Sequence, residues 1–157
     1  MILDKRLEFA DATSVAAAAG TALIGNVIDM EVVRDVGNGQ PVYCVITVDT
    51  EIITGGNAGT IRFELVSDST ASIATDGTAS IHWASDLFVT DDSAANDTIM
   101  NAGQQIACFA LPTEGKVYER YLGILAVIAT TTVTAGKINA FLTLDGHGWK
   151  SYADASN

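Results

Sequence analysis

The sequence predicts an all-β protein, an antiparallel β-sandwich with jelly-roll-like or Ig-like strand connections. Short runs in which apolar and polar residues alternate recur along the chain, and clusters of Gly, Asn, Asp and Ser separate them. Residues 119–129 are apolar at most positions, which is typical of an interior strand covered on both faces. Together these runs indicate about eight strands joined by long loops.

The beginning of the chain is its least regular part. Residues 1–12 alternate only loosely, and we interpret them as an extended N-terminal arm, with an edge strand or a short helix as alternatives. Residues 13–25 are rich in Ala and show no clear pattern. A strand is predicted at residues 26–33, and the two glycines within residues 36–40 then mark a turn.

The middle of the chain contains a predicted hairpin. Residues 41–49 and 60–67 each place apolar side chains at alternate positions, and a Gly-rich loop joins them. Residues 68–80 are small and polar and predict a long loop, which leads to a further strand over residues 81–89. Residues 90–103 predict a second long polar loop.

A second hairpin is predicted near the C-terminus. Residues 104–111 form a strand that Pro112 ends, and residues 119–129 and 137–145 then pair across a Thr/Gly turn. In the last of these strands the even positions are apolar and the odd positions are polar, except for Phe141. We therefore expect one buried face and one solvated face, followed by a tail over residues 146–157.

Length and composition indicate one domain over residues 1–157, with the arm and the tail at its ends. Apolar residues make up 48% of the chain and charged residues 17%, which favours a packed core over disorder. The formal charge of −11 makes a nucleic-acid partner unfavourable. No run approaches the roughly 20 apolar residues of a membrane span, and we read no secretion signal, so we expect synthesis in the cytoplasm and no membrane partner. Cys44 and Cys108 lie in apolar runs and fit a core, although the sequence leaves open whether they are close enough to pair.

The search for reactive groups predicts no catalytic residue, no metal and no cofactor. The chain has two histidines: His82 in a strand, where a surface or interface role is expected, and His147 in a Gly-flanked turn beside Asp145. Two potential ligands are fewer than a zinc site uses. The acidic stretch over residues 91–97 lacks the ligand spacing of a calcium loop. We expect a protein that is not an enzyme.

Four segments resemble, in the same order, the capsid cement proteins of tailed bacteriophages, the Bbp16-like family. They are the opening Met-Ile-Leu-Asp-Lys-Arg-Leu-Glu-Phe-Ala-Asp-Ala over residues 1–12, Arg-Asp-Val-Gly-Asn-Gly-Gln-Pro-Val-Tyr over 34–43, Glu-Arg-Tyr-Leu over 119–122, and Thr-Ala-Gly-Lys-Ile-Asn-Ala-Phe-Leu-Thr-Leu-Asp over 134–145. The resemblance spans residues 1–145. It implies a jelly-roll-like sandwich on the outer surface of the virion, where it clamps neighbouring major capsid protein subunits and stabilises the head.

Two other classes remain as alternatives to a structural virion protein. A carbohydrate- or receptor-binding sandwich on the virion surface would gather Trp83, Trp149 or Tyr side chains in one cleft. A small jelly-roll enzyme would need a set of metal-binding histidines, which two histidines do not supply.

The predicted partner-binding residues are apolar side chains that the pattern leaves uncovered. The arm carries Ile2, Leu3, Leu7 and Phe9 without the spacing of a helix or a buried strand, so we expect a partner, the parent domain or a dimer mate to cover them. Phe141, on the otherwise polar face of its strand, predicts contact with a second copy of the chain. We expect a homodimer, with a trimer as the alternative.

Overall fold

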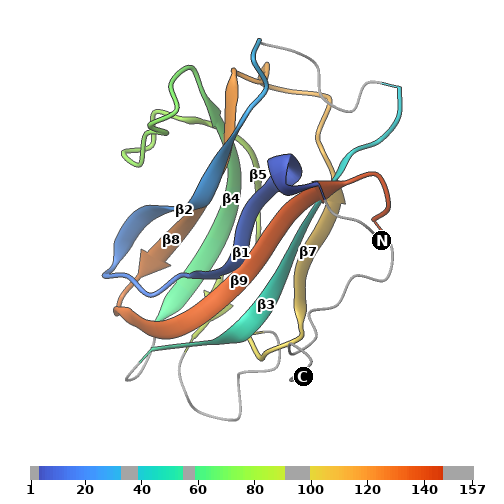
Figure 1. Cartoon of the computed structure of the whole chain (residues 1–157). Coiled ribbons are helices and arrows are strands. Elements are labelled where there is room, and N and C mark those ends of the chain that lie inside the picture. Colours follow the sequence, from blue (N-terminus) through green and yellow to red (C-terminus); the bar gives the residue numbers. More distant parts are fainter. Residues whose placement is uncertain (1–3, 33–38, 55–58, 91–99, 147–157) are drawn as a thin grey trace.

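The computed structural model describes residues 4–32, 39–54, 59–90 and 100–146 (Figure 1). A 3-10 turn, η1 (Lys5–Leu7), comes first, and strands make up the remaining elements. The strands are β1 (Glu8–Ser14), β2 (Gly20–Asp29), β3 (Tyr43–Thr54), β4 (Thr60–Asp68), β5 (Ser80–Ala84), β6 (Phe88–Val89), β7 (Gln105–Ala110), β8 (Tyr121–Ala129) and β9 (Val133–Thr143).

The strands form two antiparallel sheets that face each other, as the sequence predicted. One sheet has the order β1-β9-β3-β7, and the other has the order β2-β8-β4-β5, with β6 pairing beside β4. The pairs β1–β9, β2–β8, β3–β7 and β4–β5 are nested, so the chain behaves as one long antiparallel ribbon folded across two sheets. Eight long strands in this order define a jelly roll, and the predicted β-sandwich is confirmed.

Both predicted hairpins are wrong, although their strands exist. β3 and β4 lie in different sheets, and so do β8 and β9. Leu122 and Ile124 of β8 meet Ile138 and Leu142 of β9 in one core, across the sandwich rather than within a sheet. The alternation pattern indicates which side chains face the core. The pattern is the same whether two strands pair within one sheet or face each other from two sheets.

The N-terminal segment is a strand rather than a free arm from Glu8 onward. β1 pairs with β9 at the edge of its sheet, and Phe9 is fully buried in the core. The edge strand, which the sequence analysis kept as an alternative, is therefore correct for residues 8–12. β2 also starts earlier than predicted, at Gly20, because its Ala and Thr residues form a regular ladder with β8 without an obvious apolar pattern.

β8 is covered on both faces, as predicted for residues 119–129. Its inner face packs in the main core, while Leu125 on its outer face packs with Val66, Ile73 and Ala79. Ile73 belongs to the predicted polar loop, which thus lies over the outer face of the sheet. Gly123 allows this packing, since a Cβ atom there would lie 2.5 Å from the Cδ1 atom of Ile73.

One open edge of the sandwich is closed by a close approach of β1 and β2. Gly25 has a φ of +66°, and a Cβ atom on it would lie 2.0 Å from the carbonyl oxygen of Phe9. The register of β2 against β8 shifts between Ile24 and Ile28, so the glycine sits in a bulge. The seam positions Phe9 in the core and η1 beside the end of β2.

We expect Gly25→Ala to lower the free energy of unfolding by at least about 2 kcal/mol, because the new methyl group meets backbone that has no rotamer to change. Gly77→Ala is the matched control: its φ of +90° is also positive, but nothing lies within 4 Å of a Cβ atom there. The control should lose only the roughly 1–2 kcal/mol of left-handed strain. Urea unfolding measures both values, and equal losses would show that the seam is not tightly packed.

Candidate functional site

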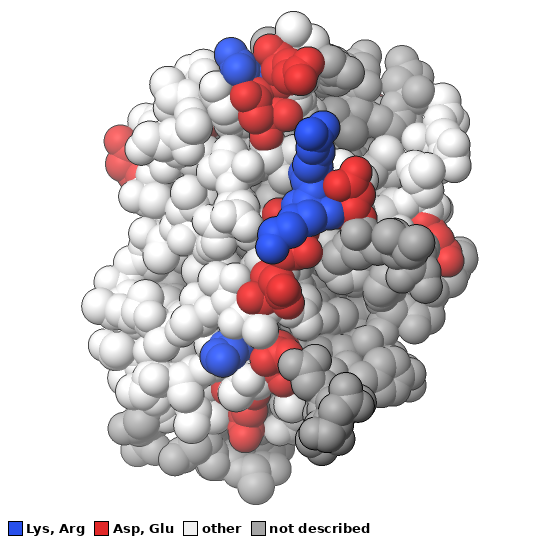
Figure 2. All heavy atoms as spheres, viewed as in Figure 1, with Lys and Arg blue, Asp and Glu red and all other residues white. Residues whose placement is uncertain are grey.

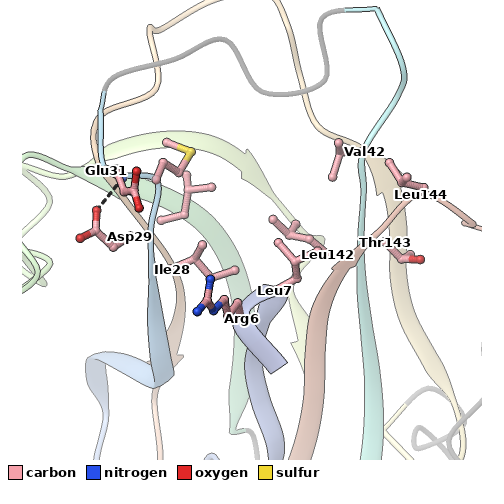
Figure 3. Close-up of a pocket in the computed structure, with 11 residues that line it drawn as sticks. Arg6, Leu7, Ile28, Asp29, Glu31, Val42, Leu142, Thr143 and Leu144 are labelled. Carbon is pink, nitrogen blue, oxygen red and sulfur yellow. Dashed lines mark hydrogen bonds between the residues drawn. The ribbon is translucent and has the colours of Figure 1, made fainter. Parts of the chain in front are cut away.

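A hollow of about 510 Å³ lies between the two sheets at the end of the sandwich where η1 is found (Figure 3). Its walls come from η1, the end of β2, the residue before β3, the start of β8 and the end of β9. The lining residues are Arg6, Leu7, Ile28, Asp29, Met30, Glu31, Val42, Leu122, Leu142, Thr143 and Leu144. Most of these side chains are apolar, and the charged ones stand on the walls formed by η1 and the β2 end.

An ion pair fixes the wall of the hollow at the end of β2. Arg120 donates from Nε and Nη2 to the two carboxylate oxygens of Asp29, each at 2.8 Å. The backbone N–H of Glu31 donates to the same carboxylate at 2.7 Å, and the N–H of Met30 donates to the carbonyl of Arg120 at 2.9 Å. The bonds to the carboxylate, first the one from Arg120 and then the one from the N–H of Glu31, hold the pKa of Asp29 down to about 2. The pair ties the end of β2 to the start of β8.

The charged side chains are unevenly distributed over the surface. Figure 2 shows them in a band down the middle of this view, while mostly uncharged side chains cover the side on which β2, β8 and β4 lie in Figure 1. On the face shown, the charges of the described residues are thus confined to one band, and the broad surface beside it carries few of them.

The structure separates the predicted partner-binding residues. Leu7 lines the hollow and is 38% exposed. Phe9 is fully buried in the core and Phe141 is 5% exposed, so the chain itself already covers both. For Phe9 the alternative in which the parent domain covers the arm is therefore correct, and for Phe141 the expectation of an uncovered side chain that needs a second copy was wrong. Ile2 and Leu3 lie outside the described residues.

The pattern failed at Phe141 because the outer face of its sheet is also buried there. Phe141 pairs with Val45 of β3, which has no exposed surface either. Phe9 was misjudged because the register of β1 shifts between Glu8 and Ala10, and this irregularity hides the alternation that a buried strand normally shows.

His82 is part of a polar link between the end of β4 and the segment before β8. Its Nε2 lies 2.7 Å from Oγ of Ser67, and its ring stacks on Tyr118 at 3.9 Å. Ser67 has no exposed surface and also accepts the N–H of Glu119 at 3.0 Å. Burial is the main cause that lowers the pKa of His82, followed by the nearby Lys116. This geometry joins structural elements, and the buried hydroxyl offers no path for a substrate.

The other residues considered as metal ligands or reactive groups lie partly within the described residues. No group of three or more His, Cys, Asp or Glu in the described parts of the chain is arranged to hold a metal ion. His147, Trp149 and the acidic stretch over residues 91–97 lie outside the description. Cys44 and Cys108 are free: Cys44 is buried in the core, while Cys108, opposite the neighbouring Val45, is exposed. Adjacent strand residues point to opposite faces, so the two thiols lie on different sides of the sheet.

A second hollow, of about 460 Å³, lies at the other edge of the sandwich. Trp83 lines it together with Asp86 and Gln105. Trp83 stacks on Phe109 at 4.0 Å, which bridges the edge strands β5 and β7 of the two sheets. An aromatic ring beside polar side chains is the arrangement that a sugar site requires.

Sequence reasoning did not identify the first hollow, although its parts were in view. Of its eleven described lining residues, seven belong to the four segments that carry the resemblance described above. These seven are Arg6, Leu7, Val42, Leu122, Leu142, Thr143 and Leu144. The four segments themselves were visible in the sequence. That they converge on one site becomes visible only in the fold.

The geometry thus defines the class of protein as a jelly-roll sandwich with an apolar hollow at one end. The family model Bbp16 matches residues 9–142, and the chain belongs to this family. A search of curated proteins finds no match. Among the described residues, no helix is long and apolar enough to cross a membrane.

We expect a carboxyl pKa of about 2 for Asp29 in an NMR titration of the folded protein. Because this pKa is below the ordinary value of about 3.9, the pair favours folding above that value, and its contribution is lost as the pH falls toward 2. Arg120→Gln removes the main cause and should return the pKa toward the ordinary value. Asp76, whose lowered pKa depends on Thr78 instead, is the internal control and should not move.

Proposed function

We propose that this protein is a capsid cement protein of a tailed bacteriophage. It binds the outer surface of the virion head, contacts neighbouring major capsid protein subunits and stabilises the shell. The observation that carries the proposal is membership of the Bbp16 family over residues 9–142, together with the four-segment resemblance to cement proteins. The protein then acts by binding alone, without a catalytic step or a cofactor.

Two features of the molecule support this role. The segments that carry the resemblance meet at the apolar hollow, so the shared sequence describes a surface site and not only a core. The broad uncharged surface beside the charged band suits a wide contact with a protein lattice (Figure 2).

Self-association remains part of the proposal, but Phe141, the residue from which it was first predicted, no longer supports it. Phe141 is already covered by the chain itself, so it does not call for a second copy. A homodimer remains the expected state, because closed two-fold dimers are the commonest oligomers. Sedimentation velocity at micromolar concentration measures it directly.

The direct test uses expanded heads from a phage strain that lacks the gene for this chain. We expect the purified protein to co-sediment with these heads, with a dissociation constant of about 1 μM or lower, and to raise the temperature at which they rupture. Serum albumin at the same concentration is the negative control. Binding no stronger than the control would contradict the proposal.

A carbohydrate-binding module is the second candidate, because Trp83 lies beside polar side chains in the second hollow. In that case calorimetry with oligosaccharides from the host surface would give heat that Asp86→Ala abolishes. We expect no such heat from a cement protein, and head binding of Asp86→Ala within about threefold of the unchanged protein.

A further inference from the structure

Large apolar side chains are exposed at the mouth of the first hollow. Leu7 is 38% exposed and Leu144 is 59% exposed, and Val32, 54% exposed, follows directly after the lining residue Glu31. These are three of the seven large apolar side chains that are exposed in the described parts of the chain. Their concentration around one concave site indicates a surface that another molecule covers.

The size of the hollow indicates what fits it. At about 510 Å³ it falls within the range of roughly 300–1,000 Å³ that ligand-binding pockets occupy. Ile28, Leu122 and Leu142 form its floor and are nearly buried, so they offer a dry apolar surface. The space accepts roughly two or three large side chains from outside.

Two charges stand beside this apolar space. The carboxylate of Asp29 is already neutralised by Arg120. Arg6, on the η1 wall, makes no ion pair with any described residue. Glu31, on the wall after β2, is attracted by Arg120 but forms no direct ion pair with a described residue. Figure 3 shows both side chains at the hollow, one from each wall. An occupant is therefore met by a cation on one side and an anion on the other.

We propose that the hollow receives a surface segment of the major capsid protein. The segment inserts two or three large apolar side chains, places an acidic residue toward Arg6 and places a basic residue toward Glu31. This inference rests on the proposed function and adds the part of the molecule that makes the contact. A fatty acid would match Arg6 alone and leave the carboxylate of Glu31 beside its hydrocarbon tail, which is unfavourable.

A second copy of the chain fits the hollow less well. If two copies met mouth to mouth across a two-fold axis, two concave surfaces would face each other. Leu7 and Leu144, the exposed apolar side chains that line the hollow, would then each face the same rim of the other copy. The two hollows would merge into a larger void, whereas stable interfaces are closely packed.

The first experiment compares head binding of two variants in the co-sedimentation assay described above. Leu144→Asp places a charge at the mouth of the hollow, and Leu87→Asp makes the same change at a side chain of nearly equal exposure, 60% against 59%, that does not line it. We expect Leu144→Asp to weaken head binding at least about tenfold and Leu87→Asp to change it less than about threefold. Equal melting temperatures check that both variants fold.

The charges are tested in the same way. Arg6→Gln and Glu31→Gln should each weaken binding about threefold to tenfold at low salt, and less at high salt. Lys116→Gln and Glu114→Gln, which do not line the hollow, are the controls for the loss of one positive or negative charge. If the control variants weaken head binding as much as Arg6→Gln and Glu31→Gln do, the charges inferred for the partner segment are wrong.

The occupant is identified by a photoreactive side chain placed at position 144, with position 87 as the control. Irradiation of the protein on heads should cross-link position 144, and not position 87, to the major capsid protein. A cross-link from position 144 to another copy of this chain would overturn the inference in favour of the dimer. If the unchanged protein binds heads and Leu144→Asp binds them equally well, the hollow is not the contact while the proposed function stands. Failure of the unchanged protein to bind heads would overturn both.

Discussion

The pairing of the first strand with the last one is the constraint on which the rest of the structure depends. The nested ribbon of a jelly roll places β1 beside β9, so η1 and the end of β9 meet although they lie near opposite ends of the described chain. Asn139 accepts the backbone N–H of Ala12 at 2.7 Å, and the carbonyl of Gly136 accepts the N–H of Val15 at 3.0 Å. The first bond satisfies β1 where its register shifts, and the second continues the contact just beyond the strand. At the other end of β1, the pairing of Glu8 with Phe141 places η1 at the mouth of the hollow.

The other wall of the hollow depends on the start of β8. This strand is buried on both faces, so its position is set by the core on one side and by the loop that carries Ile73 on the other. Arg120 comes directly before β8 and binds Asp29 at the end of β2. The end of β2, which forms one wall of the hollow, is therefore held in place relative to β8. The ion pair is exposed and adds little to global stability, so its effect is on local geometry.

The sequence was sufficient to predict which residues form strands and which faces they bury. Alternation at Ile138, Ala140 and Leu142 identified a core face, and continuous apolarity identified β8 as an interior strand. The pairing was not predictable, because alternation records the direction of a side chain and not the neighbour of its backbone. Asn139 and Gly136 illustrate this. Asn139 accepts a hydrogen bond from β1, and Gly136 leaves room for Ile52 because it has no side chain. Neither role is visible without the register of the strands.

The candidate site was not predictable from the sequence for a related reason, because alternation does not show where a strand ends. The alternation placed Leu144 on the apolar face that was expected to be buried, but Leu144 follows the end of β9 and is 59% exposed, so this part of the prediction was wrong. Gly146 lies against the ring of Tyr43, and its carbonyl accepts a hydrogen bond from Cys108 at 2.7 Å. Although Cys108 is exposed, partial desolvation of its sulfur raises the pKa of the thiol further above neutral pH, so the thiol remains a donor.

The opposite side of the mouth is held in a similar way. The carboxylate of Asp4 accepts the N–H of Arg6 at 2.9 Å, and its carbonyl accepts the N–H of Leu7 at 2.8 Å. With both sides fixed before a partner arrives, association costs little ordering of this surface, and more of the free energy of apolar burial remains for affinity. A preformed apolar hollow suits a protein whose role is to hold neighbouring subunits in one arrangement.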